Sequence, residues 1–174
     1  MIKIKKYKTL ISTNSLAKEM KKPKPWLVVW AEKQTAGYGK KKASWFSPQG
    51  GLYFSVILPK SKIEDLQTLT ILAAFIVAKV IKENFNLEPF VKLPNDIYIN
   101  QKKVAGILTE NVIGKEVKFS IIGIGLNTNI NKFSKDLENT ATSLKIELGK
   151  EVDNKKILIK IVEELKSQLK TISE

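Results

Sequence analysis

The sequence contains no cysteine, no histidine and no arginine. Without cysteine there are no disulfide bonds and no thiolate nucleophiles, and without histidine as well the commonest ligands of zinc are missing. Any acid–base chemistry must therefore be carried out by carboxylates, by lysines or by a substrate itself. All 30 basic residues are lysines, which offer point charges but no planar, two-pronged contact.

Long apolar runs are also missing. The N-terminus, M-I-K-I-K-K-Y-K, has no signal-like core, and the longest apolar stretch, residues 71–81, is short and interrupted by Lys79. We find no low-complexity tract and no internal repeat. These features predict a cytoplasmic globular protein that does not span a membrane.

The composition fits one globular domain with a strong positive charge. The chain has 174 residues, of which 43% are hydrophobic and 27% charged, so we expect a single domain over residues 1–174. Its net charge of +13 suggests an anionic partner such as a nucleotide, a nucleic acid, an acidic protein or a membrane surface. The lysines are spread along the whole chain, so charge alone does not choose among these partners.

Apolar periodicity predicts alternating strands and helices. The expected strands are residues 2–10, 26–32, 52–58, 90–93, 97–99, 103–112 and 117–127, and the expected helices are residues 16–21, 64–84, 142–148 and 154–171. Several of the strands are joined by short turns that favour hairpins. The fold class is therefore α+β, with a mixed or largely antiparallel sheet and helices packed on one face.

The loop between the second and third strands has the features of an anion-binding segment. It reads Q-T-A-G-Y-G-K-K-K-A-S-W over residues 34–45, with glycines that free the backbone and lysines that supply charge. The alternative is an exposed basic turn in a lysine-rich protein. The whole loop, residues 34–51, is expected to be a mobile cover, and Trp45 is either minor core or a stacking surface for a base.

Two further stretches carry polar groups at the ends of elements. Ser12-Thr13-Asn14 precedes a helix, where such side chains cap the first turn, and a helix N-terminus also presents donors to a polar ligand. The K-L-P-N-D stretch, Lys92 to Asp96, is an ordinary turn, but it places opposite charges close together at a strand end.

The last predicted strand carries a pair of glycines. Gly123 and Gly125 are two residues apart and so point to the same face of the sheet. Glycine weakens a strand interior, so the pair indicates that something approaches the backbone there, either a ligand or a crossing helix.

Taken together, these stretches resemble the catalytic domain of biotin protein ligases. The matching motifs are S-T-N, E-K-Q-T-A-G-Y-G-K, W-F-S-P-Q-G-G-L-Y-F-S, K-L-P-N-D-I-Y-I, K-K-V-A-G-I-L-T-E and G-I-G-L-N, in this order. The resemblance implies a fold like that of class II aminoacyl-tRNA synthetases. It also implies a ligase reaction in which biotin and ATP, with Mg²⁺, give biotinyl-5'-AMP, and a lysine of a biotin carboxyl carrier protein then takes the biotinyl group.

The resemblance also implies a role for particular residues. Biotin would contact polar and small side chains, namely Ser12, Thr13, Asn14, Gln34, Gly37, Tyr38, Gly39, Lys40, Lys103, Gly106, Gly123 and Gly125. The nucleotide would be bound by Lys40, Trp45, Lys103 and Asn127. Catalysis would depend on Lys103, Lys40, Asp96 and Lys92. Asp96 would help to orient or deprotonate the carrier lysine, and Lys92 would hold Asp96 in place. No residue is assigned as a metal ligand.

The sequence departs from the family pattern at several points. Tyr38, Lys40 and Lys41 stand where the family usually has arginines, and Leu93 stands where it usually has tryptophan. We expect neither an N-terminal helix-turn-helix nor a C-terminal small barrel, and no binding to DNA. A homodimer is one option for the oligomeric state. A lipoate ligase-like acyl transferase, a basic nucleic-acid-binding module and a ligase that binds biotin without turnover are the alternatives.

Overall fold

The structure is a computed structural model that describes residues 2–58 and 65–173. Within these residues seven strands form one sheet in the order β1-β2-β3-β7-β6-β5-β4. The pairing of β1 with β2 is parallel, and the other pairings are antiparallel. The strands are β1 (Lys3–Leu10), β2 (Leu27–Gln34), β3 (Leu52–Leu58), β4 (Phe90–Lys92), β5 (Asp96–Ile99), β6 (Lys102–Ile113) and β7 (Val117–Leu126).

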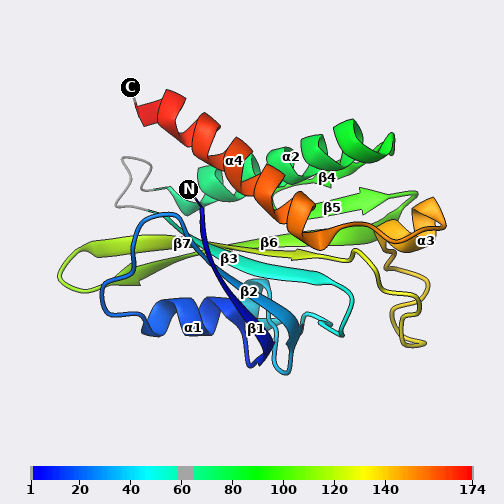
Figure 1. Ribbon diagram of the computed structural model, residues 1–174, viewed down its shortest axis with the longest axis horizontal. Helices are drawn as coiled ribbons and strands as arrows, with labels where there is room; N and C mark the ends of the chain where they lie inside the picture. The colour runs from blue at the N-terminus through cyan, green and yellow to red at the C-terminus, as the bar shows by residue number, and fades with distance from the viewer. Residues whose placement is uncertain (1, 59–64, 174) are drawn as a thin grey trace.

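Helices cover both faces of this sheet. The long helices α2 (Leu66–Phe85) and α4 (Asn154–Ser173) lie on one face, and α1 (Thr13–Glu19) lies on the other (Figure 1). A short helix, α3 (Leu144–Leu148), follows the loop after β7. The prediction of helices on one face therefore describes the two long helices, while α1 provides a second layer. No helix in the described part of the chain is both long and apolar enough to cross a membrane.

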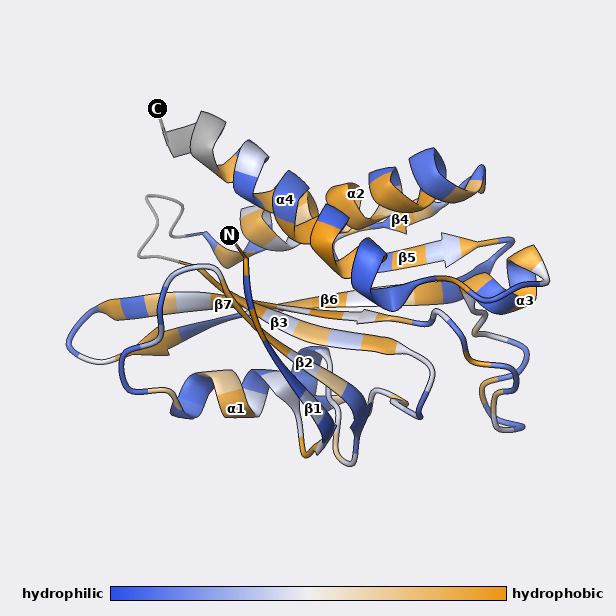
Figure 2. Ribbon diagram, in the orientation of Figure 1, coloured by the Kyte–Doolittle hydropathy of each residue, from blue (hydrophilic) through white to orange (hydrophobic). Residues whose placement is uncertain are grey.

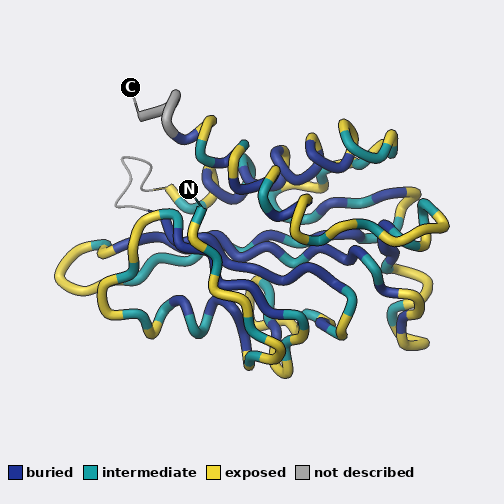
Figure 3. Tube along the Cα trace, in the orientation of Figure 1, coloured by how far each residue is buried: buried dark blue, intermediate teal, exposed yellow. Residues whose placement is uncertain are grey.

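Two apolar clusters explain why the sheet is covered on both sides. Alternate residues of a strand point to opposite faces, so Val28 packs in the cluster under α2 and α4, and Val29 packs in the cluster with Ala17 of α1. Every residue of β3, in the middle of the sheet, is buried. The apolar faces of α2 and α4 turn toward the sheet (Figure 2), and the central strands are mostly buried, whereas β1 at the edge has no buried residue (Figure 3).

The α1 face is where the sheet can hold a site. Phe119 and Ile121 of β7 pack in the α1 cluster, so Gly123 and Gly125, which continue the same alternation, also face this side. Gly125 is paired with Gly106 on β6. Where the start of β6 lies beside the end of β7, the α1 face of the sheet therefore has a patch of glycines. This patch lies between α1 and the loop that follows β2.

Candidate active site

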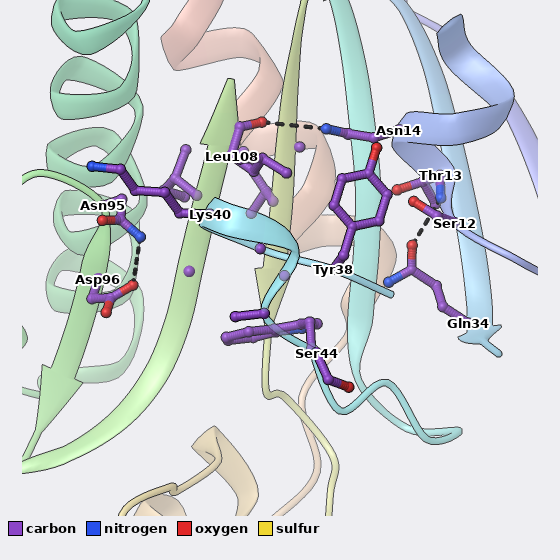
Figure 4. A pocket seen from close by; sticks show the side chains of 18 of the residues that line it. Ser12, Thr13, Asn14, Gln34, Tyr38, Lys40, Ser44, Asn95, Asp96 and Leu108 are labelled. Carbon is purple, nitrogen blue, oxygen red and sulfur yellow. Dashed lines mark hydrogen bonds between the residues drawn. The ribbon is translucent and has the colours of Figure 1, made fainter. Parts of the chain in front are cut away.

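A cavity of about 340 Å³ lies on the α1 face of the sheet, between α1, the loop after β2, and strands β5 to β7 (Figure 4). It brings together most of the residues expected from the sequence: Ser12, Thr13, Asn14, Gln34, Tyr38, Gly39, Lys40, Trp45, Asp96, Lys103, Gly106, Gly123 and Gly125. Asn95 and Leu108 also line it. The lining, as far as the described residues show it, does not include three of the expected residues, namely Gly37, Lys92 and Asn127.

One end of the cavity is formed by the first turn of α1. Ser12 is the N-cap, with its side chain accepting a hydrogen bond from the Ser15 amide, as the sequence predicted. The helix begins at Thr13, three residues before its predicted start, because the polar residues form the first turn as well as the cap. Ser55 Oγ of β3 lies 2.8 Å from Thr13 Oγ1 and 2.6 Å from Asn14 Oδ1, so its one proton is donated to one of these two oxygens, and both side chains contact β3.

Gln34, the last residue of β2, joins this helix to the loop. Its Oε1 accepts from the Thr13 amide at 2.8 Å, and its Nε2 donates to Ser47 Oγ at 2.9 Å. Gly37 packs directly against this carboxamide, because a Cβ at that position would lie 2.7 Å from Gln34 Nε2 and 2.6 Å from Ser47 Oγ. Gly37 therefore supports Gln34 from outside the cavity.

The loop itself, which we call the flap (residues 35–47), is a small hairpin. Tyr38 forms a bridge with Ser44, and the Gly39 amide donates to the Ala43 carbonyl at 2.8 Å. The three lysines Lys40–Lys42 make a 3₁₀ turn at the exposed tip. Figure 4 shows Lys40 extending along the side of the cavity that holds Asn95 and Asp96. The flap thus places a cation over the opposite end from α1.

The glycines of the sheet accommodate two protein side chains. A Cβ on Gly125 would lie 2.4 Å from Trp45 Nε1, and one on Gly106 would lie 3.0 Å from Trp45 Cζ3. A Cβ on Gly123 would lie 2.3 Å from Asn14 Oδ1. The crossing helix that the sequence left open is therefore α1 at Gly123, whereas at Gly125 the close approach is made by the indole of the flap.

Lys103 and Asp96 form an ion pair at the end of the cavity away from α1. Lys103 Nζ lies 2.7 Å from Asp96 Oδ1 and 5.1 Å from the centroid of the Trp45 ring. Asn95 Nδ2 donates to Asp96 Oδ1 at 2.8 Å. Positive charge, a carboxylate and an aromatic surface therefore meet at one place.

In this structure Asp96 is paired with Lys103 and not, as the sequence led us to expect, with Lys92. The two residues are opposite each other in the β4–β5 pair, but the ion pair of Asp96 is made with Lys103 of β6. Lys92 Nζ instead lies 5.6 Å from the centroid of the Tyr98 ring. Since Asp96 sits on β5 between β4 and β6, its carboxylate can turn to either neighbour, and the sequence could not show which.

Asn127 lies beside the cavity in a structural role. It is 4% exposed, and its Nδ2 donates to the Thr142 carbonyl at 3.0 Å. Its backbone bonds to Val104 and to Leu144 at the start of α3. In this structure the side-chain amide therefore fastens the loop before α3 to the sheet.

One polar residue beside the cavity was not singled out from the sequence. Glu110 of β6 accepts hydrogen bonds from Lys18 Nζ at 2.5 Å, from Asn14 Nδ2 at 2.8 Å and from Tyr38 Oη at 3.0 Å. Burial acts to raise the pKa of Glu110, but the hydrogen bonds from Lys18, Asn14 and Tyr38 outweigh it and hold that pKa below its ordinary value. The signal was present, since Glu110 ends the K-K-V-A-G-I-L-T-E motif.

The Glu110 carboxylate should make folding stability depend on pH. Because its pKa is lower in the folded chain than in the unfolded chain, its contribution is present above the ordinary value of 4.5 and is lost as the pH falls through the folded pKa. Glu110→Gln should therefore lower the melting temperature at pH 7, and the difference from wild type should shrink as the pH falls below the ordinary value of 4.5. Thermal unfolding of both proteins across this range checks it, and an undiminished difference in acid would contradict it.

Comparison with known proteins places this fold and site in a family. The chain belongs to the biotin/lipoate A/B protein ligase family, whose model matches residues 6–127. It is 41% identical over 152 residues to the bifunctional ligase/repressor BirA of Bacillus subtilis, and the match covers 83% of this chain and 46% of that protein. It is 33% identical over 114 residues to the human biotin–protein ligase, which covers 60% of this chain and 16% of that protein.

Solved structures agree with this assignment. A biotin protein ligase from Aquifex aeolicus in complex with biotin and ATP has a TM-score of 0.91 and 31% identity, covering 99% of this chain and 72% of that chain. A Leishmania major biotin protein ligase in complex with biotinyl-5-AMP has a TM-score of 0.78 and 27% identity, covering 94% of this chain and 73% of that chain. The expected α+β fold of the biotin protein ligases is thus confirmed.

The lipoate branch of the family is more distant from this chain. Plasmodium falciparum LipL1 in complex with lipoate has a TM-score of 0.63 at 10% identity, covering 97% of this chain and 62% of that chain, which shows the shared fold alone.

The chain spans about half the length of the BirA proteins that it matches.

Proposed function

We propose that this chain activates biotin with ATP as biotinyl-5'-AMP and transfers the biotinyl group to a lysine of a biotin carboxyl carrier protein. The observation that carries this proposal is the single cavity that Gln34 and Lys103 line from opposite ends. Hydrogen-bonding groups at one end suit a neutral ring system, and lysines at the other end suit a carboxylate and a phosphate.

The α1 end would fix the position of biotin. Its ureido ring has both donors and acceptors, and here the Ser12 and Thr13 hydroxyls and the Gln34 carboxamide offer both kinds of group around one space. Thr13 and Gln34 are already held by hydrogen bonds to their neighbours, so they need little reordering when a ligand binds. This end would therefore set the direction in which the carboxylate of biotin points.

The lysine end would carry the chemistry of activation. Bringing a carboxylate to the α-phosphate of ATP places two anions side by side, which fixed positive charge nearby makes possible. Lys103 is held by Asp96, and Lys40 extends from the flap toward the same end. The biotin carboxylate forms a bond to the α-phosphorus, and pyrophosphate leaves with the electrons of the broken P–O bond.

Mg²⁺ would act with the phosphates of ATP. Among the described residues no group of three carboxylates could hold a metal ion, and Asp96 is the carboxylate among the residues that line the cavity. This fits Mg²⁺, which commonly uses one or two carboxylates together with substrate phosphates. Asp96 and Asn95 are the residues of the lining that could hold such an ion, and the ion would supply charge neutralisation for the departing pyrophosphate.

Transfer to the carrier would complete the reaction. The lysine amine of the carrier attacks the acyl carbon of the adenylate, an amide bond forms, and AMP leaves. An ammonium group must lose a proton before it can attack, and Asp96 at this end of the cavity is the carboxylate placed to orient it. No histidine is needed, because the adenylate is itself the activated acid.

Incubation of the protein with ATP, biotin and a carrier domain tests the proposal. Mass spectrometry of the carrier should show one biotinyl group, which should disappear when ATP is omitted or when the acceptor lysine is replaced by arginine. Lipoate in place of biotin should give far less product. An unmodified carrier with biotin, or preferred transfer of lipoate, would overturn the assignment.

A further inference from the structure

Glu110 has no part in the reaction described above, yet its hydrogen bonds join α1 and the flap to β6 beside the cavity. We propose that Glu110 is a positioning residue that latches the flap over the cavity through the hydroxyl of Tyr38, and couples this closure to α1 through Asn14. The inference rests on the proposed function in one respect, namely that the closed flap protects an acyl-adenylate. The closure of the flap by Glu110 is a property of this chain's conformation and does not depend on that function.

A single carboxylate oxygen links the flap to the pocket. Glu110 Oε2 accepts from Tyr38 Oη at 3.0 Å and from Asn14 Nδ2 at 2.8 Å. Lys18 binds the other oxygen at 2.5 Å, and the side chain of Glu110 is 21% exposed. With a lowered pKa and a lysine partner, the carboxylate is ionised at neutral pH, which strengthens both hydrogen bonds that it accepts.

The position of Tyr38 in the flap explains why its hydrogen bond to Glu110 can hold the outer part of the flap in place. The base of the flap is tied by the Thr35 amide to Leu10 at 2.9 Å and by the Ala36 amide to Ile11 at 3.0 Å. Tyr38 lies further out, next to the tip, and its hydroxyl reaches across to β6. Loss of this bond would therefore free the outer part of the hairpin while the base stays attached.

Asn14 makes the latch responsive to what fills the cavity. Its amide contacts Glu110, its oxygen lies over Gly123, and it lines the cavity itself. A ligand that holds Asn14 in place therefore also holds Glu110 where Tyr38 can reach it. The closed flap would then keep water from the acyl-adenylate until the carrier arrives.

Tyr38→Phe is the variant that tests closure without measuring activity. It keeps the ring, which lies between Lys18 and Lys42 with Nζ-to-centroid distances of 5.6 and 4.2 Å, and removes only the hydroxyl. Limited digestion with trypsin should cut the variant after the exposed lysines 40–42 about tenfold faster than wild type, the effect of one hydrogen bond to a charged group.

Internal references make this measurement specific. Cleavage after the exposed Lys132 and Lys135, in the loop beyond β7, should proceed at the same rate in both proteins. Ser120→Ala removes a hydrogen bond to Asn111, the residue next to Glu110, and should leave cleavage of the flap unchanged. Equal flap cleavage in wild type and Tyr38→Phe would overturn the latch whether or not the protein is a ligase.

A second measurement asks what the latch protects. With ATP and biotin but no carrier, Tyr38→Phe and Glu110→Ala should each release the acyl-adenylate into solution about tenfold faster than wild type, measured per adenylate formed. Both changes break the bond between Tyr38 and Glu110, so adding Tyr38→Phe to Glu110→Ala should not speed the release further. Additive effects would overturn the coupling. If wild type forms no adenylate, the proposed function fails, and the digestion alone decides the latch.

Discussion

Replacement of Lys103 by alanine is expected to reduce pyrophosphate release from ATP and biotin by ~100-fold or more, in line with the loss of one preorganised group that stabilises transition-state charge. Lys103 is held at the cavity by its ion pair with Asp96 and lies 5.1 Å from the Trp45 ring centroid. Without it, the biotin carboxylate and the α-phosphate meet with less positive charge between them. A pyrophosphate-coupled assay at saturating substrates measures the change.

The controls for Lys103→Ala separate charge from packing. Lys103→Met keeps an aliphatic stem on Trp45 but removes the charge, so it should lose as much activity while melting close to wild type. Lys102→Ala changes the neighbouring residue of β6, whose Nζ donates to the Glu138 carbonyl away from the cavity lining, and should retain normal turnover. Normal turnover in Lys103→Met would remove this lysine from the mechanism.

The fold was predictable from local signals. Strand 52–58 was predicted at its observed bounds, and the two long helices were predicted within two residues of their observed bounds, apart from residue 64, which lies outside the described residues. These elements have strong apolar patterns, because burial on one or both faces of a sheet dictates which residue types they contain. The polar segment before Leu16 was harder, since serine, threonine and asparagine serve equally well as a cap or as a first helical turn.

Most of the residues that line the cavity were predictable, but their contacts with one another were not. Gln34, Lys103 and the glycines of the sheet line one cavity. Gln34, Gly123 and Gly125 belong to stretches with an unusual local pattern, whereas the family resemblance pointed to Lys103 and Gly106. The partner of Asp96 depended on which way one side chain turns between two strands, and nothing in the local sequence encodes that choice. Glu110 was overlooked for the same reason, because its partners come from residues 14, 18 and 38.

The most direct test of how Trp45 packs in the site is to add a single methyl group to Gly125. Gly125→Ala would place a Cβ 2.4 Å from Trp45 Nε1 and 2.6 Å from Cε2, closer than side chains approach one another, so the indole must move. The resemblance assigns Gly125 to biotin and Trp45 to the nucleotide, whereas the structure packs Trp45 on Gly125. The variant should therefore raise the KM for ATP by about tenfold or more, the effect of typical overpacking, and raise the KM for biotin less.

Two comparisons show whether the methyl group acts through the indole. Gly39→Ala, in the flap, brings its Cβ no closer than 3.8 Å to the Ala43 carbonyl oxygen, so it leaves Trp45 in place and should leave the KM for ATP unchanged. In a Trp45→Ala background the added methyl group has room, so Gly125→Ala should then have little further effect, because the two changes act on the same contact. A KM for biotin that rises as much as the KM for ATP, or an undiminished effect without Trp45, would mean that Gly125 meets the ligand itself. The glycine in the sheet would then be a substrate contact, and the indole would be its neighbour by coincidence of packing.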